Sequence, residues 1–296
     1  MTDPHLHAVI DERRQLINLA YRLIGSLAEA EDVVQETYVR WYALSERQRQ
    51  DVVTPGAWLT TVASRICLDL LGSARARREQ YVGEWIPEPI PDHSEWLGGP
   101  APGDPADRVT LDESIGMAFL VVLDSMTPAE RVAFVLHDVF RYSFAEIVEI
   151  VGRTPAACRQ LASSARRRID TSQRPSSAQR ADVVRDFKRA WETSDMEALI
   201  GLLDPTTIAT ADSGGLAPAF RDPITGSEHI ASAWIEIATR GPQVALLERT
   251  VNGQPGLVAQ LRDAVISVYA FDIVGNRITR IWAIRNPEKL RLWTTG

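Results

Sequence analysis

The chain has 296 residues, 45% of them hydrophobic, and a formal net charge of −7. This length suits two or three domains with ample core material, and no apolar run approaches the roughly 18 residues of a membrane-spanning helix. The N-terminus lacks a signal-peptide pattern, so we expect a cytoplasmic protein without a membrane segment.

The first part of the chain, from about residue 8 to residue 78, reads as an all-helical unit. Apolar residues recur at helical spacing in residues 10–25 and again in 27–44. The exposed side of the second helix is acidic, and it includes Asp32, Gln35 and Glu36. A solvated face is the usual fate of such a run, and the alternative is a docking surface for a basic partner helix.

A polar loop at residues 45–56 precedes a third helix, which starts near Ala57. Trp58 stands at its beginning, and Arg65 lies outside its apolar stripe. The helix runs into an arginine cluster that contains Arg75, Arg77 and Arg78. This pattern suits capture of single-stranded nucleic acid, because bases stack on aromatic rings while arginines neutralise the backbone. A core tryptophan followed by a basic helix end is an equally good interpretation of these residues alone.

Residues 81–107 form a linker rich in proline and glycine. Its segment Trp85-Ile86-Pro87-Glu88-Pro89-Ile90 has a fixed φ at alternate positions, which predicts a stiff extended strip that docks onto another surface. From Glu84 to Glu113 there are eight acidic residues against one arginine, Arg108. The linker therefore carries much of the negative charge.

Two more helices are predicted at residues 109–124 and 128–137, and a helix-turn-helix follows at 144–169. The break between its helices has a turn glycine, Gly152, an N-cap threonine, Thr154, and a proline at the first helical position.

The second helix of this motif is rich in hydrogen-bond donors, which suits recognition of base edges and phosphates. A basic, solvated helix of an ordinary bundle is the alternative. Residues 153–174 contain six arginines and one acidic residue, so this segment has the opposite charge to the acidic linker. Because phosphate neutralisation dominates affinity, the net negative charge requires either that the charge is segregated, as it is here, or that DNA is bound only with help. The polar residues are Arg159, Gln160, Ser163, Ser164, Arg166, Arg167 and Arg168.

From residue 178 the pattern changes to an α+β unit. Helices are predicted at 178–194, 196–203 and 228–239, with a strand at 208–211 and a glycine-rich loop at 212–215. Four strands joined by hairpin turns then predict an antiparallel meander, at residues 243–251, 256–262, 264–271 and 277–285. We expect a curved sheet wrapped against helices.

This order of parts resembles a known family. The acidic helix with Ala-Glu-Asp-Val-Val-Gln-Glu-Thr at 30–37, the Trp58-Leu59 helix ending in arginines, and the closing helix-turn-helix resemble the σ2 and σ4 regions of extracytoplasmic-function (ECF) sigma factors of bacterial RNA polymerase. The resemblance covers roughly residues 16–78 and 111–169. The remainder is similar to the SnoaL-like, NTF2-like fold, which one subgroup carries as a C-terminal extension in place of a dedicated membrane anti-sigma partner.

The subgroup's short motifs are matched by the strip at 85–90, by Asn-Pro-Glu-Lys-Leu at 286–290 and by the Asp-Ser-Gly-Gly loop at 212–215. The loop departs from the pattern at Ser213, where a glycine is expected, and at Leu216, where a lysine is expected. The resemblance implies interdomain regulatory contacts by Trp85, Pro87, Pro89, Asp212, Gly214, Gly215, Asn286, Pro287 and Lys289.

The implied fold is multidomain, with two all-α domains followed by an α+β cone. Region 2 covers residues 1–78, an acidic linker 79–110, region 4 residues 111–172, and the SnoaL-like domain 178–296. The implied function is promoter-specific transcription initiation. The implied partners are promoter DNA and core polymerase, whose positively charged DNA channel is compatible with a negative sigma subunit.

The resemblance also implies a role for each site. Asp32, Gln35 and Glu36 would dock on the clamp helices of the β′ subunit, and the β flap is a second implied contact. The −10 element would be opened and read by Trp58, Arg65, Arg75, Arg77 and Arg78. The −35 element would be read in the major groove by Arg153, Thr154, Arg159, Gln160, Ser163, Ser164 and Arg167.

Two regulatory hypotheses follow. In the first, the C-terminal sheet, the loop and the tail pack on the linker strip and hold the DNA-reading domains too close together to span −10 and −35. In the second, carboxylates of the linker occupy the cationic path of polymerase as an RNA mimic. The second hypothesis concerns Glu84, Glu88, Asp92 and Glu95.

Two other classes of function are alternatives. A ligand-responsive one-component regulator leaves residues 16–78 unexplained. An enzyme would use an NTF2-like pocket with Asp212, Asp222 and His229 as acid–base groups, lined by Trp191, Trp234 and Trp282. Such scattered groups are more often structural, so we expect no catalytic residues, while small-molecule sensing stays open. The sequence has no nucleotide loop, HExxH or EF-hand pattern, and Cys67 and Cys158 have no zinc spacing, so we infer no metal or cofactor.

Overall fold

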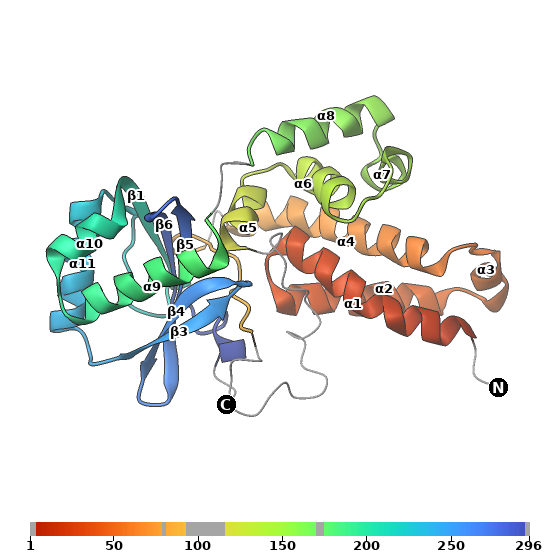
Figure 1. Cartoon of the computed structure of the whole chain (residues 1–296). Helices are drawn as coiled ribbons and strands as arrows, with labels where there is room; N and C mark the ends of the chain where they lie inside the picture. The colour runs from red at the N-terminus through yellow and green to blue at the C-terminus, as the bar shows by residue number, and fades with distance from the viewer. Residues whose placement is uncertain (1–3, 79–80, 93–115, 170–174, 294–296) are drawn as a thin grey trace. The chain divides into compact units, whose positions relative to one another are not determined.

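The computed structural model describes residues 4–78, 81–92, 116–169 and 175–293 (Figure 1). These residues form two compact units. Unit 1 contains the described residues up to 78 and those from 120 to 169, and unit 2 contains residues 81–92, 116–119 and 175–293. Among the described helices, none combines the length and the apolarity that a bilayer crossing requires.

Unit 1 begins with four helices: α1 (Pro4–Ile24), α2 (Leu27–Ala43), α3 (Glu46–Asp51) and α4 (Pro55–Arg78). The apolar stripes predicted for α1, α2 and α4 supply its core, including Leu16, Val33 and Leu59. The prediction of a loop across residues 45–56 is wrong, because 46–51 form α3. Ser45 and Gln48 make a reciprocal capping box there, and α3 has no buried residue whose periodicity could reveal it.

The second half of unit 1 contains most of α5 (Met117–Asp124), whose residues 117–119 belong to unit 2. It also contains α6 (Pro128–Phe134), a π-helix η4 (Val135–Val139), α7 (Phe144–Val151) and α8 (Pro155–Arg166). The predicted start of the first helix at 109–115 lies outside the described residues. The helix-turn-helix of α7 and α8 is confirmed: Gly152 ends α7 at φ 67°, and Thr154 accepts a hydrogen bond from the Ala157 N–H.

The two halves of unit 1 contact each other directly. The Arg131 guanidinium donates to the Leu23 carbonyl at 2.9 Å, and the Tyr142 hydroxyl donates to Thr60 Oγ1 at 2.9 Å. Arg65 donates to the carbonyl of Glu149 in α7 at 2.6 Å. The helix that carries the predicted −10 residues is therefore bonded to the first helix of the helix-turn-helix.

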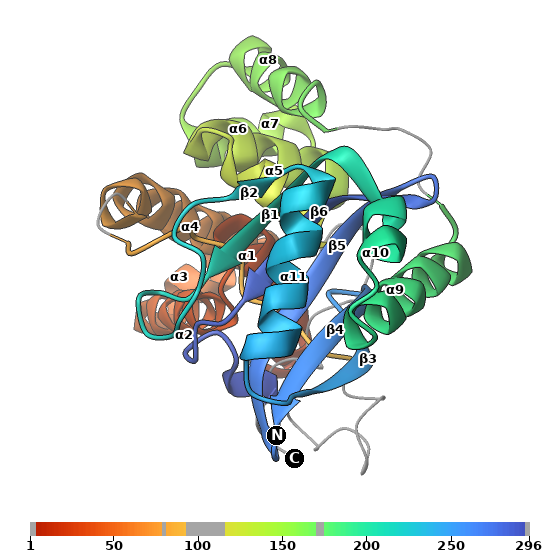
Figure 2. The same cartoon turned by 90° about the vertical axis from the view of Figure 1, so that its left-hand side faces the viewer.

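Unit 2 is a mixed sheet with helices α9 (Ser177–Glu192), α10 (Met196–Leu202) and α11 (Ser227–Arg240), which lie over one face of the sheet in Figure 2. The sheet order is β2-β1-β6-β5-β4-β3. Strands β3 to β6 form the predicted antiparallel meander, which is confirmed. The parallel pairing of β1 with β6, and the short β2, were not predicted. The strands are β1 (Leu203–Asp212), β2 (Ile224–Thr225), β3 (Ala245–Val251), β4 (Gln254–Leu261), β5 (Ala264–Val274) and β6 (Arg277–Ile284).

Aromatic rings fill the space between this sheet and its helices. Phe187 packs edge-to-face with Trp191, Trp234 and Phe271, at ring-centroid distances of 6.3, 6.3 and 5.4 Å. Trp191 also meets Tyr269 at 5.3 Å. These geometries are the ones that ring quadrupoles favour, so the aromatic side chains act as the core of unit 2.

Candidate functional site

The linker strip, defined as residues 85–90, is held by hydrogen bonds along its backbone. The Ile86 N–H donates to Asp212 Oδ2 at 2.9 Å, and the Ile90 N–H donates to Asn252 Oδ1 at 3.0 Å. The Pro89 carbonyl accepts from the indole of Trp293 at 2.9 Å. Residues 86–91 are all buried. The prolines remove backbone donors, so this buried strip has few polar groups left to satisfy.

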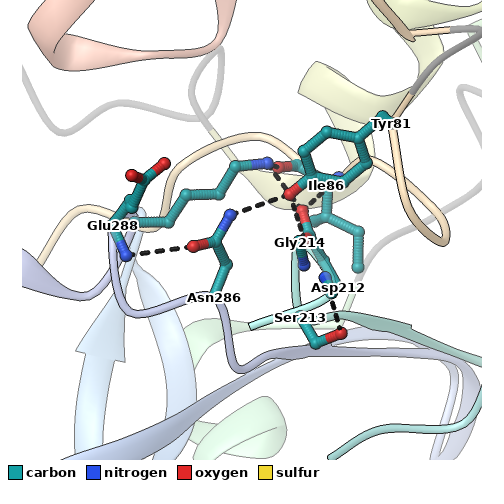
Figure 3. Close-up of polar contacts among 9 residues, drawn as sticks. Tyr81, Ile86, Asp212, Ser213, Gly214, Asn286 and Glu288 are labelled. Carbon is teal, nitrogen blue, oxygen red and sulfur yellow. Dashed lines mark hydrogen bonds and ion pairs between the residues drawn. The ribbon is translucent and has the colours of Figure 1, made fainter. Parts of the chain in front are cut away.

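Asp212, at the end of β1, is the centre of the network that binds the strip (Figure 3). Its carboxylate is fully buried and accepts hydrogen bonds from the Tyr81 hydroxyl at 2.6 Å and from the Gly214 N–H at 3.1 Å. Lys289 of the C-terminal tail pairs with its second oxygen at 2.6 Å. A buried carboxylate needs such partners, because an unpaired charge is strongly disfavoured in the interior.

Tyr81 connects the linker, the loop and the tail. Its hydroxyl donates to Asp212 and accepts from the Asn286 amide at 2.8 Å. Burial, followed by the hydrogen bond to the Asp212 carboxylate, raises the pKa of Tyr81 above its usual range. The phenol therefore stays neutral and keeps its role as a donor.

The backbone of Gly214 lies close against two side chains of this network. Its φ is +58°, and a Cβ there would stand 2.5 Å from Asn286 Nδ2 and 3.1 Å from the Tyr81 hydroxyl. Glycine is the residue that tolerates both the left-handed backbone and this crowding.

We expect Gly214→Ala to destabilise unit 2 more than Gly275→Ala does. Gly275 has φ +59°, but a Cβ there would have no atom within 4 Å. Gly275→Ala therefore measures the cost of the backbone strain alone, about 1–2 kcal/mol. Urea unfolding of both variants measures the difference. Equal losses would mean that the contacts of Asn286 and Tyr81 with Gly214 contribute nothing.

The structure brings most of the predicted interdomain residues together. Trp85 is half-buried, Pro87 and Pro89 are buried, and Gly215 and Pro287 are exposed beside the network. Sequence reasoning missed Tyr81, Asn252 and Trp293. No local pattern marks them, because their partners lie 131, 162 and 204 residues away.

The second candidate site is α8, the predicted recognition helix, together with the residues that flank it. Six of its predicted DNA-contacting residues are exposed, and Arg159 also lies over the Phe144 ring at 5.7 Å. Ser164 is the exception, because its hydroxyl donates to Glu130 Oε1 at 2.9 Å. It therefore fixes α8 to α6 instead of facing outward. The exposed six are Arg153, Thr154, Arg159, Gln160, Ser163 and Arg167.

Glu130 anchors α8 from beneath. Its carboxylate accepts from the Thr127 cap and from Ser164, and Arg168 lies 3.5 Å away. Burial acts to raise the pKa of Glu130, but the hydrogen bonds from Thr127 and Ser164 and the charge of Arg168 outweigh it, so the pKa is lowered.

Glu130→Gln should therefore destabilise unit 1 by about 1–3 kcal/mol at neutral pH. A lowered folded pKa gives stability that is present above the unfolded value of about 4.3 and is lost as the pH falls through the folded value. The gap between wild type and variant should thus shrink in acid. Denaturant unfolding between neutral and acidic pH measures it, with the exposed Glu149→Gln as control; a gap independent of pH would contradict the assignment.

The predicted polymerase-binding residues Asp32, Gln35 and Glu36 are exposed on α2, and Glu36 pairs with Arg40 at 2.9 Å. Trp58 is half-buried and packs edge-to-face with Trp41 at 5.2 Å. Arg75, Arg77 and Arg78 lie on α4, but their side chains are outside the described part of the chain.

Two other sets of predicted residues remain, the carboxylates of the RNA-mimic hypothesis and the acid–base groups of the enzyme hypothesis. Glu88 is 7% exposed, so the docked strip cannot present it as an RNA mimic; Glu84 is exposed, Asp92 half-buried, and Glu95 lies outside the described residues. The three residues of the acid–base set have separate surroundings. Asp212 is bound to the linker, while the exposed His229 lies 3.0 Å from the Thr225 carbonyl and Asp222 is exposed. Trp191 and Trp234 belong to the aromatic core, and Trp282 is buried outside that cluster.

Comparison with known proteins agrees with this architecture. The Sigma-70 region 2 family matches residues 9–77, which covers most of α1–α4, and the Sigma-70, region 4 family matches residues 116–169, which covers α5–α8. The matches to these two regions, with the helix-turn-helix of α7 and α8 in the second, identify a sigma factor, the subunit that gives RNA polymerase its promoter specificity.

Relatives that match nearly the whole chain narrow the assignment within the sigma factors. The chain is 36% identical over 293 residues to the ECF RNA polymerase sigma factor SigJ of Mycobacterium tuberculosis, covering 94% of this chain and 90% of that protein. It is 34% identical over 295 residues to the probable ECF RNA polymerase sigma factor SigI of the same species, covering 97% and 95%. The crystal structure of M. tuberculosis SigJ aligns with a TM-score of 0.74 at 31% identity, over 96% of this chain and 98% of that one.

The chain therefore belongs to the ECF sigma factors of RNA polymerase and is of the SigJ type. The C-terminal α+β part of unit 2 is the SnoaL-like, NTF2-like extension. The sigma regions imply binding of RNA polymerase and promoter DNA.

Proposed function

We propose that this sigma factor is inhibited in cis by its C-terminal unit, which sequesters the linker between the two DNA-reading regions. The observation that carries the proposal is the burial of the linker strip under the contacts of Asp212, Asn252 and Trp293. A linker anchored in this way is not free to lie in a polymerase channel between region 2 and region 4. Release of the strip is the activating step.

The contacts inside unit 1 support the same proposal. The −10 and −35 elements are about 25 base pairs apart, or about 85 Å at 3.4 Å per base pair. Arg65 on the predicted −10 helix is hydrogen-bonded to the carbonyl of Glu149 in α7, and Tyr142 to Thr60. Both bonds must break before the two regions bind elements so far apart.

Within this scheme the residue roles are as follows. The exposed acidic face of α2 binds the β′ clamp helices, and region 4 also contacts the β flap. The start of α4, with Trp58 and Arg65, reads the −10 element, and the exposed residues of α8 read the −35 element. The protein acts where polymerase acts, in the cytoplasm.

Run-off transcription with core polymerase tests the proposal. We expect a chain ending at Arg285, which lacks Asn286, Lys289 and Trp293, to give several-fold more transcript than the full-length protein. A chain ending at Asp170 controls for complete removal of unit 2. Equal transcript from full-length and Arg285-terminated chains would contradict inhibition by the tail.

A further inference from the structure

The ammonium group of Lys289 lies in a closed set of partners that come from other segments. It stands over the Trp85 ring at 4.3 Å and over the Tyr81 ring at 5.3 Å. It donates to the Ile86 carbonyl at 2.5 Å and to Asp212 Oδ2 at 2.6 Å. We call Tyr81, Trp85, the Ile86 carbonyl and Asp212 the ammonium box.

Together, the parts of the box favour a cation that carries N–H donors. The two ring faces attract positive charge through their quadrupoles. The carboxylate is fully buried and therefore strongly disfavours loss of its counter-charge. The carbonyl and the carboxylate oxygen both accept hydrogen bonds, which a primary ammonium supplies and a quaternary ammonium does not.

The occupant is separable from the box. Linker residues and the end of β1 supply all four walls, whereas Lys289 comes from the tail beyond β6. The side chain of Lys289 is 12% exposed, so it enters from the edge of the site. The box can therefore persist when the tail departs, provided that another cation replaces Lys289.

We propose that the ammonium box is a binding site for a primary ammonium ligand, which Lys289 fills in cis and with which a free alkylamine or a lysine side chain of another protein competes. This inference rests on the proposed cis inhibition for its regulatory meaning, because an amine that replaces Lys289 removes one of the bonds between the tail and the linker and leaves those of Asn286 and Trp293. The binding itself is independent of transcription.

Chemical rescue of the full-length Lys289→Ala protein tests the site. The readout is hydrogen exchange of the Ile86 and Ile90 amides, which donate to Asp212 and Asn252. Loss of a charge-assisted hydrogen bond should lower their protection by at least about tenfold. Ethylammonium and Nα-acetyl-lysine amide are tested in separate arms. Rescue by both shows that the primary ammonium alone suffices, whereas rescue by the lysine derivative alone assigns the site to a lysine side chain.

The controls test whether binding requires N–H donors on the ligand and the carboxylate of Asp212. Tetramethylammonium and sodium chloride at the same ionic strength should restore nothing, because they carry no N–H donors. Lys289→Ala combined with Asp212→Asn should not respond to ethylammonium. Rescue by sodium chloride, or absence of rescue in a folded Lys289→Ala protein, overturns the proposal.

A second measurement avoids any variant that fails to fold. In the wild-type protein, ethylammonium should compete with Lys289 and increase exchange at the backbone amide of Lys289, which donates to the Asn286 carbonyl, while Ile86 and Ile90 stay protected. Unchanged exchange at Lys289 would contradict competition. Rescue without any difference in transcription between full-length and truncated chains would retain the site and refute only the cis inhibition.

Discussion

Asp212→Asn should release the linker strip and increase transcription from the full-length protein. The substitution removes the charge that faces the Lys289 ammonium, and it replaces one of the acceptors for Tyr81 and Ile86 with an amide donor. Breaking a buried pair in this way destabilises a protein by about 3–5 kcal/mol. Urea unfolding of unit 2 and run-off transcription with core polymerase measure the two effects.

Asp204→Asn is the matched control, because Asp204 lies at the other end of β1 and bonds only locally, to Thr206 and Thr207, among the contacts described here. It should leave the exchange of the Ile86 amide unchanged. A finding that Asp212→Asn unfolds unit 2 without raising transcript yield would count against sequestration as the inhibitory step.

Arg159→Ala combined with Gln160→Ala should abolish most of the preference of this sigma factor for its −35 element. Both side chains are exposed on α8, and each bidentate contact with a base contributes about 1–3 kcal/mol of discrimination. The affinity of the holoenzyme for promoter DNA should therefore fall by at least about thirtyfold. Filter binding on promoters with an intact or scrambled −35 element measures the loss.

Two controls accompany this experiment. Arg189→Ala removes an exposed arginine from α9, outside the sigma regions, and should leave promoter affinity unchanged. Ser164→Ala breaks the bond to Glu130 and should lower the stability of unit 1 more than it lowers −35 discrimination. If Ser164→Ala reduced discrimination as strongly as the double variant, our separation of anchoring from reading residues would be wrong.

The helix-turn-helix was predictable because its signals are local. Gly152, Thr154 and Pro155 are adjacent in the chain, and each has a distinct backbone requirement that the structure meets. The strip at residues 85–90 was predictable as an extended docking segment for the same reason, since its prolines fix the backbone. Ser45 and Gln48 also carried a local signal, the capping box, which would have revealed α3.

The partners of these segments were not predictable from local pattern. The parallel pairing of β1 with β6 joins residues about 70 positions apart, and no turn signal marks such a pairing. Ser164 and Ser163 are adjacent residues of one type, and only the packing of α6 against α8 shows that Ser164 faces Glu130. The role of Tyr81 likewise depends on its contacts with Asp212 and Asn286, and no spacing in the sequence connects these residues to it.

The position of Trp293 has a consequence for how the protein is made. Its indole bonds to Pro89 across 204 residues, and at about 5–20 residues per second this interval of synthesis takes roughly 10 to 40 s. By the later part of that interval both sigma regions have been translated, but the tail that covers the strip has not. Each new molecule therefore passes through a stage in which Trp293 does not yet cover its linker strip, and under the proposed cis inhibition the linker would be sequestered only once Trp293 has been translated.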